Sequence, residues 1–448
     1  MIPDAWRAGE IAVVGLARSG AAVTRWLRRN GMTVYASDAA ESPELTETAA
    51  ALRGAGATVE MGRHDLGRIR RAAVVVVSPG VPPDAPPITA ARDAGREIVA
   101  EIDVAARALS GTRVIAITGT NGKTTTTALI AHVLKGAGVR AEAGGNIGRP
   151  LIELAGLAPP LDWAVVEVSS FQLHDAPHLA PAVGVLTNLS PNHLDRYKSV
   201  DAYYGDKRLL FRNATLDSLW IVNGDDSEVL KLSNGVPGTH RRFRTQGTAD
   251  AWYDRANARL VLDGAPFMER RALPLLGDHN VENALVAALA SRAAGVEPAG
   301  IAHGLASFRA LPHRLEPVGD VAGVLWLNDS KATSVAAALV GMRAMDRPFV
   351  WLAGGKHKGK PYTALNPFLK RARRAIVFGE SAPIIARDIA GHVGVETVAS
   401  LEPAVERARA LAQPGDAVLL SPACSSFDQF HSYEERGDLF RRLVGALT

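Results

Sequence analysis

The residues of this sequence best suited to chemistry lie in a short loop, G-T-N-G-K-T-T at positions 119–125. The loop follows the β-branched apolar run 114–117 and precedes an apolar pattern with helical spacing, which predicts strand, loop and helix. Glycines let such a loop wrap an anion, and the N-terminus of the helix favours negative charge. The amine of Lys123 can reach terminal phosphates, and the hydroxyl of Thr124 can coordinate Mg²⁺. Position 117 is Ile where the standard phosphate loop has glycine. The strand before the loop and the helix after it nevertheless favour a site that binds a nucleoside triphosphate, and the alternative is a plain turn with a surface lysine.

Further candidate groups follow the ends of two predicted strands in the same region. Glu167 ends the run D-W-A-V-V-E, and His193 and Asp195 come shortly after A-V-G-V-L-T-N-L. Carboxylate and imidazole groups on that edge are candidate metal ligands or partners of such ligands. For His193 alone, a turn histidine bonded to the backbone is the alternative. Lys207 lies in a predicted helix over 201–211, where a solvated lysine is the simplest interpretation.

The first hundred residues predict a nucleotide-binding unit of alternating strands and helices. Strands are expected at 10–15, 33–36 and 73–77. A glycine turn after the first strand and Asp38 after the second are typical of such a unit. The S-P-G-V-P-P loop after the third strand lies where ligands bind in open α/β sheets. Ala17 replaces the middle glycine of G-x-G-x-x-G, so a dinucleotide is not indicated, and a plain strand–helix turn is the alternative.

The rest of the chain predicts a third α/β unit. Residues 236–275 predict a small β region, and a helix starting near Asp278 places Asn280 and Asn283 on one face. Helix capping is the alternative for Asp278 and Asn280. Beyond this helix, four short strands separated by helical segments indicate the third unit. These strands are expected at 325–327, 349–352, 375–378 and 417–420.

Length and composition exclude several classes of protein. A chain of 448 residues with 47% apolar and 21% charged residues is typical of a soluble enzyme with more than one domain. The net charge of +4 comes from scattered basic residues, so nucleic-acid binding is not expected. No run approaches the roughly 18 apolar residues of a membrane span, and a signal-peptide pattern is not expected at the start. The single cysteine, Cys424, fits a reducing cytoplasm and is expected to be a small packed residue rather than a nucleophile.

Several of these segments resemble the Mur ligase family, which includes folylpolyglutamate synthetase. The loop at 119–125 is similar to the phosphate loop of that family, which accounts for Ile117. Asn121 stands where the L-alanine-adding members typically have His, and the D-N-P-R motif of the diaminopimelate-adding members is absent. The other similar motifs are G-N-I-G (145–148), E-V-S-S-F-Q-L (167–173), N-H-L-D-R-Y (192–197), N-D-S-K-A-T (328–333) and S-P-A-C-S-S-F-D-Q-F (421–430).

The resemblance covers nearly the whole chain and implies an α/β fold in three domains. An N-terminal Rossmann-like domain over 1–102 would bind the UDP end of the substrate. A central P-loop ATPase-like domain over 103–311 would bind ATP, and a C-terminal Rossmann-like domain over 312–448 would admit the amino acid. The implied reaction uses ATP to phosphorylate the carboxylate of UDP-N-acetylmuramoyl-L-alanine. The amine of D-glutamate then attacks the acyl phosphate. The implied reaction is a step of peptidoglycan precursor synthesis.

The resemblance also implies roles for individual residues, matched motif by motif. Lys123, Glu167, His193 and Lys207 would be catalytic, and Thr124, Glu167, His193 and Lys207 as a carbamate would hold two Mg²⁺ ions. ATP would contact Gly119, Thr120, Asn121, Gly122, Lys123, Thr124, Thr125, Asn280, Asn283, Arg314 and Asp329. The UDP-linked substrate would contact Leu16, Ala17, Arg18, Ser19, Asp38, Ser78, Gly80, Asn146 and Ser169. D-Glutamate would contact Lys331, Thr333, Lys358, Ser425, Ser426 and Tyr433.

Three positions depart from the pattern of the family. Tyr433 stands where Phe is frequent, and Ser334 stands where Asn is usual. G-G-K-H-K-G differs from the commoner G-G-x-D-K-G, so Lys358 is the aligned choice for D-glutamate over Lys356. Contributions from two domains suggest a site that forms on closure and keeps water from the acyl phosphate.

Three other functions are compatible with parts of the sequence. A sibling ligase would add another amino acid, such as L-alanine or diaminopimelate. A binding protein without catalysis would be expected to lack Lys123, Glu167, His193 or Lys207, and all four are present. A nicotinamide dehydrogenase would leave the central loop unexplained. The expected partners are therefore small-molecule substrates, and the chain is expected to act as a cytoplasmic monomer without membrane insertion.

Overall fold

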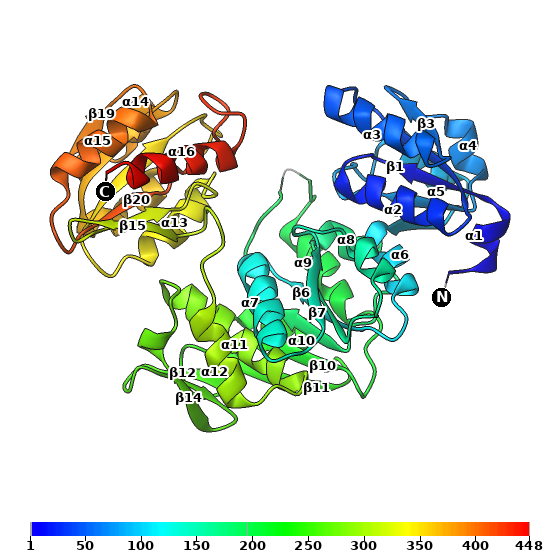
Figure 1. The fold of residues 1–448 in the computed structure, drawn as a ribbon, viewed down its shortest axis with the longest axis horizontal. Helices are drawn as coiled ribbons and strands as arrows, with labels where there is room; N and C mark the ends of the chain where they lie inside the picture. The colour runs from blue at the N-terminus through cyan, green and yellow to red at the C-terminus, as the bar shows by residue number, and fades with distance from the viewer. Residues whose placement is uncertain (1, 195, 448) are drawn as a thin grey trace. The chain divides into compact units, whose positions relative to one another are not determined.

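The computed structural model describes residues 2–194 and 196–447. Asp195, a candidate in the sequence, lies outside the described residues. The chain forms two compact units. The first unit comprises Met1–Ala272 and Glu282–Ala306, and the second comprises Leu273–Val281 and Ser307–Thr448. Two sheets belong to the first unit and one to the second, each with its own helices (Figure 1).

The N-terminal sheet is parallel, with strand order β3-β2-β1-β4-β5. Side chains of its first strand alternate between two cores: Ile11 and Val13 pack on one face, Ala12 and Val14 on the other. Burial on both faces explains continuous apolar runs such as V-V-V-V in β4. The strands are β1 (Glu10–Val14), β2 (Thr33–Asp38), β3 (Thr58–Met61), β4 (Val74–Val77) and β5 (Ile98–Ala100). The helices are α1 (Asp4–Ala8), α2 (Arg18–Arg29), α3 (Pro43–Gly54), α4 (Leu66–Arg71), α5 (Pro86–Asp93) and α6 (Glu101–Ala108).

The central sheet has nine strands in the order β14-β13-β12-β11-β10-β9-β6-β8-β7. The strand before the phosphate loop, β6, lies between β8 and β9 and runs parallel to both, so the loops after these three strands meet at one edge. The strands are β6 (Arg113–Thr118), β7 (Ala141–Gly145), β8 (Trp163–Glu167), β9 (Val183–Leu186), β10 (Leu219–Asn223), β11 (Thr239–Arg244), β12 (Ala251–Asp254), β13 (Arg259–Leu262) and β14 (Ala265–Glu269). The α-helices are α7 (Lys123–Gly136), α8 (Ser170–His174), α9 (Val200–Arg208), α10 (Ser227–Ser233), α11 (Asp278–Ala293) and α12 (Pro298–Ser307).

The sheet of the second unit has the order β15-β16-β20-β17-β18-β19, with only β15 antiparallel to its neighbour. Phe349 and Trp351 pack into the core on one face, and Val350 and Leu352 pack into the core on the other. The strands are β15 (Glu316–Val321), β16 (Val324–Asn328), β17 (Phe349–Gly354), β18 (Ala372–Phe378), β19 (Val395–Thr397) and β20 (Ala417–Leu420). The α-helices are α13 (Val335–Arg343), α14 (Ala382–Asp388), α15 (Leu401–Leu411) and α16 (Tyr433–Gly445).

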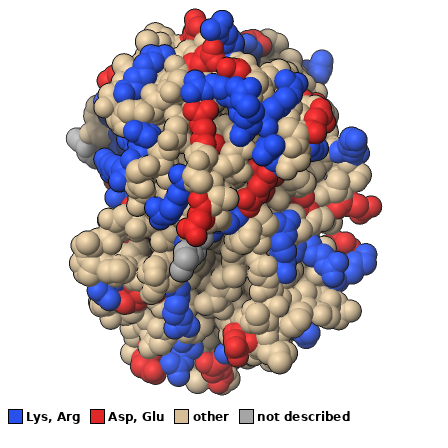
Figure 2. Space-filling view, turned by 90° about the vertical axis from the view of Figure 1, so that its right-hand side faces the viewer, with Lys and Arg blue, Asp and Glu red and all other residues tan. Residues whose placement is uncertain are grey.

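These sheets confirm the predicted α/β class and add strands that the sequence pattern did not indicate. The predicted β region 236–275 extends the central sheet by four strands, and the third sheet has six strands where four were predicted. The domain boundaries at 102 and 311 stay predictions. No described helix is both long enough and apolar enough to span a bilayer. Basic and acidic side chains are interspersed on the face shown in Figure 2, in agreement with scattered basic residues.

Candidate active site

The phosphate loop is tied to the end of β9. Gly119 has a φ of 142°, and a Cβ there would lie 2.0 Å from the Thr187 Oγ1 atom, so only glycine fits. The Thr187 hydroxyl donates to the Asn121 carbonyl at 2.7 Å, and the Thr120 N–H donates to the Asn188 carbonyl at 2.8 Å. These bonds hold the loop open in front of α7, which begins at Lys123.

Two lysine amines meet at one carbonyl of this loop. The Lys123 Nζ donates to the carbonyls of Gly119 and Thr120 at 2.9 and 2.8 Å. The Lys207 Nζ donates to the same Gly119 carbonyl at 2.8 Å. Lys207 is 1% exposed, so the sequence interpretation of a solvated lysine was wrong. The helix pattern did not reveal its burial because its neighbours Asp206 and Arg208 are charged.

Burial, followed by repulsion from Lys123, lowers the pKa of Lys207 well below the usual value. Its amine therefore deprotonates more readily than that of an exposed lysine. A neutral amine is the form that reacts with carbon dioxide, so the site fits the predicted carbamate.

Glu167 has an oxygen suited to a cation. Its side chain is 3% exposed at the end of β8, beside the phosphate-loop strand. One carboxylate oxygen, Oε1, accepts a hydrogen bond from the Asn146 Nδ2 at 3.0 Å. The other, Oε2, is buried and makes no hydrogen bond to any described residue. A buried carboxylate oxygen without a donor is costly unless a cation occupies the space, so Glu167 fits a magnesium ligand.

His193 lies on an exposed turn with a φ of 54°. Its ring meets the Phe171 ring edge-on, with ring centroids 5.3 Å apart. Among the described residues, no three His, Cys, Asp or Glu side chains cluster to hold a metal ion. A Mg²⁺ ion at Glu167 would therefore take its other oxygens from phosphate, water, a hydroxyl such as that of Thr124, or a carbamate on Lys207.

The predicted UDP-binding residues gather mainly around one cavity of about 630 Å³ at the ends of β1, β2 and β4. Asp38 stabilises the first turn, because its Oδ2 accepts from the Leu16 N–H at 2.7 Å and its Oδ1 from the Ala40 N–H at 2.9 Å. The Ser78 hydroxyl donates to the Gly15 carbonyl at 2.7 Å. Seven of the nine candidates line the cavity: Ala17, Arg18, Ser19, Asp38, Ser78, Gly80 and Asn146.

The other two candidates for the UDP-linked substrate have main-chain or capping contacts. Leu16 is buried and contributes its N–H to Asp38. Ser169 forms a capping box with Gln172: its hydroxyl accepts from the Gln172 N–H at 3.2 Å, and its own N–H donates to the Gln172 Oε1 at 3.0 Å. Helix capping alone accounts for Ser169, and substrate contact stays a prediction.

The predicted adenine-side asparagines both lie in the first turns of α11 and are largely buried. The Asn283 Oδ1 accepts from the Thr126 hydroxyl of α7 at 3.0 Å. The Asn280 Nδ2 donates to the Leu276 carbonyl at 2.8 Å. Both asparagines therefore have contacts with protein atoms, and their role toward ATP stays a prediction.

In the second unit, Asp329 directly follows the β16 strand and is buried. Its Oδ2 accepts from the Ser421 hydroxyl at 2.8 Å, and its Oδ1 from the Leu315 N–H at 3.3 Å. Burial raises the pKa of Asp329 to about 7, against the opposing effects of Ser421, the Leu315 N–H and Arg314. The charge of Arg314 thus acts on Asp329 within this unit, and the role of both residues toward ATP stays a prediction.

Five of the six predicted D-glutamate residues lie in three turns that follow strands of the second unit, and the sixth, Tyr433, is the first residue of α16. The Lys331 amine lies 5.1 Å from the centre of the Tyr433 ring. The Lys358 amine lies 3.5 Å from the Thr333 hydroxyl, whereas Lys356 pairs with Ser425 through the backbone. This arrangement brings the Lys358 side chain to Thr333. The last two candidates, Ser425 and Ser426, are buried after β20.

Sequence reasoning missed Arg436, which holds these turns together. Its side chain is fully buried on α16 and donates to the carbonyls of Ser330, Gly354 and Cys424 at 2.9, 3.3 and 3.3 Å. The Gly354 carbonyl is at the last residue of β17, and the other two carbonyls follow β16 and β20. Burial lowers the pKa of Arg436 to about 10. The sequence did contain one indication of this burial. Arg436 precedes Phe440 by four residues, a spacing that places the arginine on the apolar face of α16.

Comparison with known families and proteins agrees with this architecture. Three family models match: "Mur ligase MurD-like, N-terminal domain" over 9–100, "Mur ligase middle domain" over 117–291 and "Mur ligase, glutamate ligase domain" over 313–424. The UDP-N-acetylmuramoylalanine--D-glutamate ligase of Myxococcus xanthus is 42% identical, covering 98% of both chains. The enzyme of the same name from Gloeobacter violaceus is 40% identical, covering 98% of this chain and 99% of its own. The chain belongs to the Mur ligase family.

Solved structures share the fold at lower identity. The pseudomurein peptide ligase type C of Methanothermus fervidus superposes with a TM-score of 0.61 at 20% identity, covering 98% of this chain and 100% of its own. The UDP-N-acetylmuramate-alanine ligase MurC of Thermotoga maritima gives 0.62 at 19% identity, with the same coverage. These similarities confirm the three-domain α/β fold predicted from the sequence.

Proposed function

We propose that this chain is an ATP-dependent ligase that joins D-glutamate to UDP-N-acetylmuramoyl-L-alanine, giving ADP and phosphate, in peptidoglycan precursor synthesis. Two lysine amines and a buried carboxylate at one phosphate-binding loop carry this proposal. The first step of the reaction transfers a phosphoryl group from ATP to the substrate carboxylate. Both groups are negatively charged and repel each other, so this step needs cations such as the two lysines.

The residues of the loop would bind and orient ATP. Lys123 would exchange its bonds to loop carbonyls for the β- and γ-phosphates, and the N–H groups at the start of α7 would face the same anion. Glu167, Thr124, His193 and a carbamate on Lys207 would hold two Mg²⁺ ions, which would supply neutralisation of phosphate charge. The carboxylate of the L-alanyl group would then attack the γ-phosphate and form an acyl phosphate.

The second unit would bind D-glutamate. Two ammonium groups, those of Lys331 and Lys358, suit its two carboxylates. Thr333, Ser425, Ser426 and Tyr433 offer hydroxyl groups that can orient it. The attacking amine of D-glutamate forms the amide bond as phosphate leaves. We further propose that the protein acts as a cytoplasmic monomer on these small molecules, without nucleic acid or insertion into a membrane.

Release of phosphate from ATP tests the reaction directly. Native protein mixed with UDP-N-acetylmuramoyl-L-alanine should release phosphate with D-glutamate and not with L-glutamate. Equal release with the L-isomer, or none with either, would contradict the proposal. Release with L-alanine or diaminopimelate in place of D-glutamate would indicate a sibling ligase.

Replacement of Lys123 by Ala tests the phosphate loop. The variant should lose turnover by about 10²-fold or more, because a preorganised cation at developing charge is lost. Lys135→Ala is the matched control: this lysine lies on the same helix in an exposed ion pair with Glu142 and should keep the native rate.

A further inference from the structure

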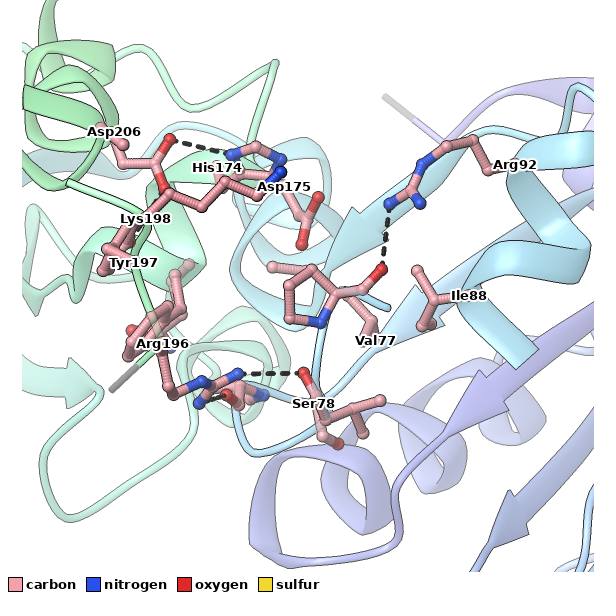
Figure 3. Close-up of a pocket in the computed structure, with 17 residues that line it drawn as sticks. Val77, Ser78, Ile88, Arg92, His174, Asp175, Arg196, Tyr197, Lys198 and Asp206 are labelled. Atoms are coloured by element: carbon pink, nitrogen blue, oxygen red, sulfur yellow. Dashed lines mark hydrogen bonds and ion pairs between the residues drawn. The ribbon is translucent and has the colours of Figure 1, made fainter. Parts of the chain in front are cut away.

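Arg196 joins the turn after β4 to the loop after β9. Its guanidinium donates to the Pro79 carbonyl at 3.4 Å and to the Val81 carbonyl at 3.2 Å. The same group lies over the Phe171 ring, 4.1 Å from its centre. Figure 3 shows the Arg196 side chain directed at the turn that begins at Ser78. The arginine thus bridges two segments that are more than a hundred positions apart in the sequence.

The segment that Arg196 holds, residues 78–81, separates two cavities. On one side lies the cavity of about 630 Å³ lined by the predicted UDP-binding residues. On the other lies a cavity of about 280 Å³, which is lined by Arg196 of the β9–α9 loop and by residues of α8. Figure 3 shows Arg196 beside this cavity. Ser78, Pro79 and Val81 line both cavities. A change in this turn therefore changes the wall of the UDP cavity.

The bond to the Pro79 carbonyl fixes the direction of the next N–H. In a trans peptide the carbonyl and the following N–H point in opposite directions. With the Pro79 carbonyl facing Arg196, the Gly80 N–H faces away from the arginine. This N–H donates to no described residue, and Gly80 lines the larger cavity. It is a donor available to an anion there.

The Phe171 ring beneath Arg196 also contacts residues near the predicted reaction centre. The Phe171 ring stacks on Tyr197 at 5.3 Å and meets His193 edge-on at the same separation. The Tyr197 hydroxyl donates to Asp206 at 2.9 Å, and Asp206 precedes the buried Lys207. Arg196 therefore packs on side chains that also contact the predicted reaction centre.

We propose that Arg196 is a positioning residue for the UDP end of the substrate. It orients the 78–81 turn so that the Gly80 N–H meets the pyrophosphate, and it sets this turn at a fixed distance from the loops of Glu167 and His193. The inference rests on the proposed function for its substrate, but its first test is binding of UDP alone, which needs no turnover.

Titration of UDP into Arg196→Met should show about tenfold weaker binding than native protein, since two hydrogen bonds that order the turn are lost. Arg196→Lys should recover only part of this loss, because one ammonium cannot span two carbonyls in the way a guanidinium does. Lys198→Met is the matched control, since Lys198 lines the smaller cavity, is exposed and forms no hydrogen bond to the 78–81 turn. It should bind UDP as native protein does.

In phosphate-release kinetics, Arg196→Met should raise the KM for UDP-N-acetylmuramoyl-L-alanine about tenfold. The KM values for ATP and D-glutamate should stay within about twofold of native. Native UDP affinity in Arg196→Met, or an equal rise in all three KM values, would overturn the inference. If that variant does not fold, Phe171→Leu decides, because loss of the ring under the guanidinium should weaken UDP binding in the same direction. Absence of turnover in native protein would contradict the proposed function and leave the UDP titration decisive for Arg196.

Discussion

Both units stabilise strand-end turns with an arginine that donates hydrogen bonds to main-chain carbonyls. The two arginines differ in the element that carries them. In the second unit, Arg436 is fully buried and comes from a helix that packs on the same sheet. In the first unit, Arg196 is half-buried and reaches the 78–81 turn from a loop of the neighbouring sheet. The predicted D-glutamate turns are therefore ordered when one sheet folds, whereas the predicted UDP turn needs two sheets.

The largest effect on this comparison is expected from Arg436→Met. The change leaves three buried carbonyls without their donor, and we expect a loss of about 3 kcal/mol in the free energy of unfolding. Urea denaturation measures the loss, and hydrogen exchange should rise at the N–H groups of residues 330–331, 354–356 and 424–426.

Arg441→Met on the same helix is the control for that variant. Arg441 forms a partly buried ion pair with Glu316. The Glu316 carboxylate keeps two other donors, the His313 N–H and the Asn328 Nδ2, so loss of Arg441 should cost at most about 1 kcal/mol. Similar losses for the two variants would show that Arg436 contributes no more than a surface residue, and the comparison would fail.

A smaller, pH-dependent effect is expected at Glu101, a second long-range contact of the first unit. Its Oε1 accepts from the Ile152 N–H at 2.6 Å, and burial raises its pKa to about 7 from an ordinary value of 4.5. Between these values the folded protein keeps a proton that the unfolded chain has lost. The contribution to stability is therefore complete below about pH 4.5 and decreases as the pH rises to about 7.

Glu101→Gln should remove this dependence. Between pH 5 and pH 8 the native free energy of unfolding should decrease by about 2 kcal/mol more than that of the variant. Urea denaturation at several pH values measures both curves. Glu142→Gln, at an acidic residue paired with Lys135 on the surface, should follow the native curve. Parallel curves for native protein and Glu101→Gln would contradict the assigned titration.

The smallest effect is expected from Cys424→Ala. The thiol lies 2.9 Å from the Tyr362 hydroxyl and 3.1 Å from the Ser381 hydroxyl, but Arg436 uses only the main-chain carbonyl of this residue. The variant should therefore keep native kcat in the phosphate-release assay and lose about 1 kcal/mol of stability. A large loss of turnover would assign the thiol a chemical role.

The sequence predicted features that depend on local pattern. The phosphate loop, the strand that ends at Glu167 and the packed Cys424 follow from apolar runs and small-residue turns, and the structure has them in place. It did not predict β5 and β19, because each has only three residues. The burial of Lys207 and the bonds of Arg196 and Arg436 depend on contacts distant in sequence, which a pattern of spacing cannot reveal.

Anchoring through the main chain has a consequence for how these turns can vary. Every amino acid offers the same carbonyl oxygen, so substitutions in the turns at 78–81 or after β20 can alter side chains while the acceptor remains. The guanidinium has no such substitute, since no other side chain spans two carbonyls with a planar fork. Divergence among copies of this fold is thus expected to accumulate in the turns, with little tolerance at the arginines that hold them.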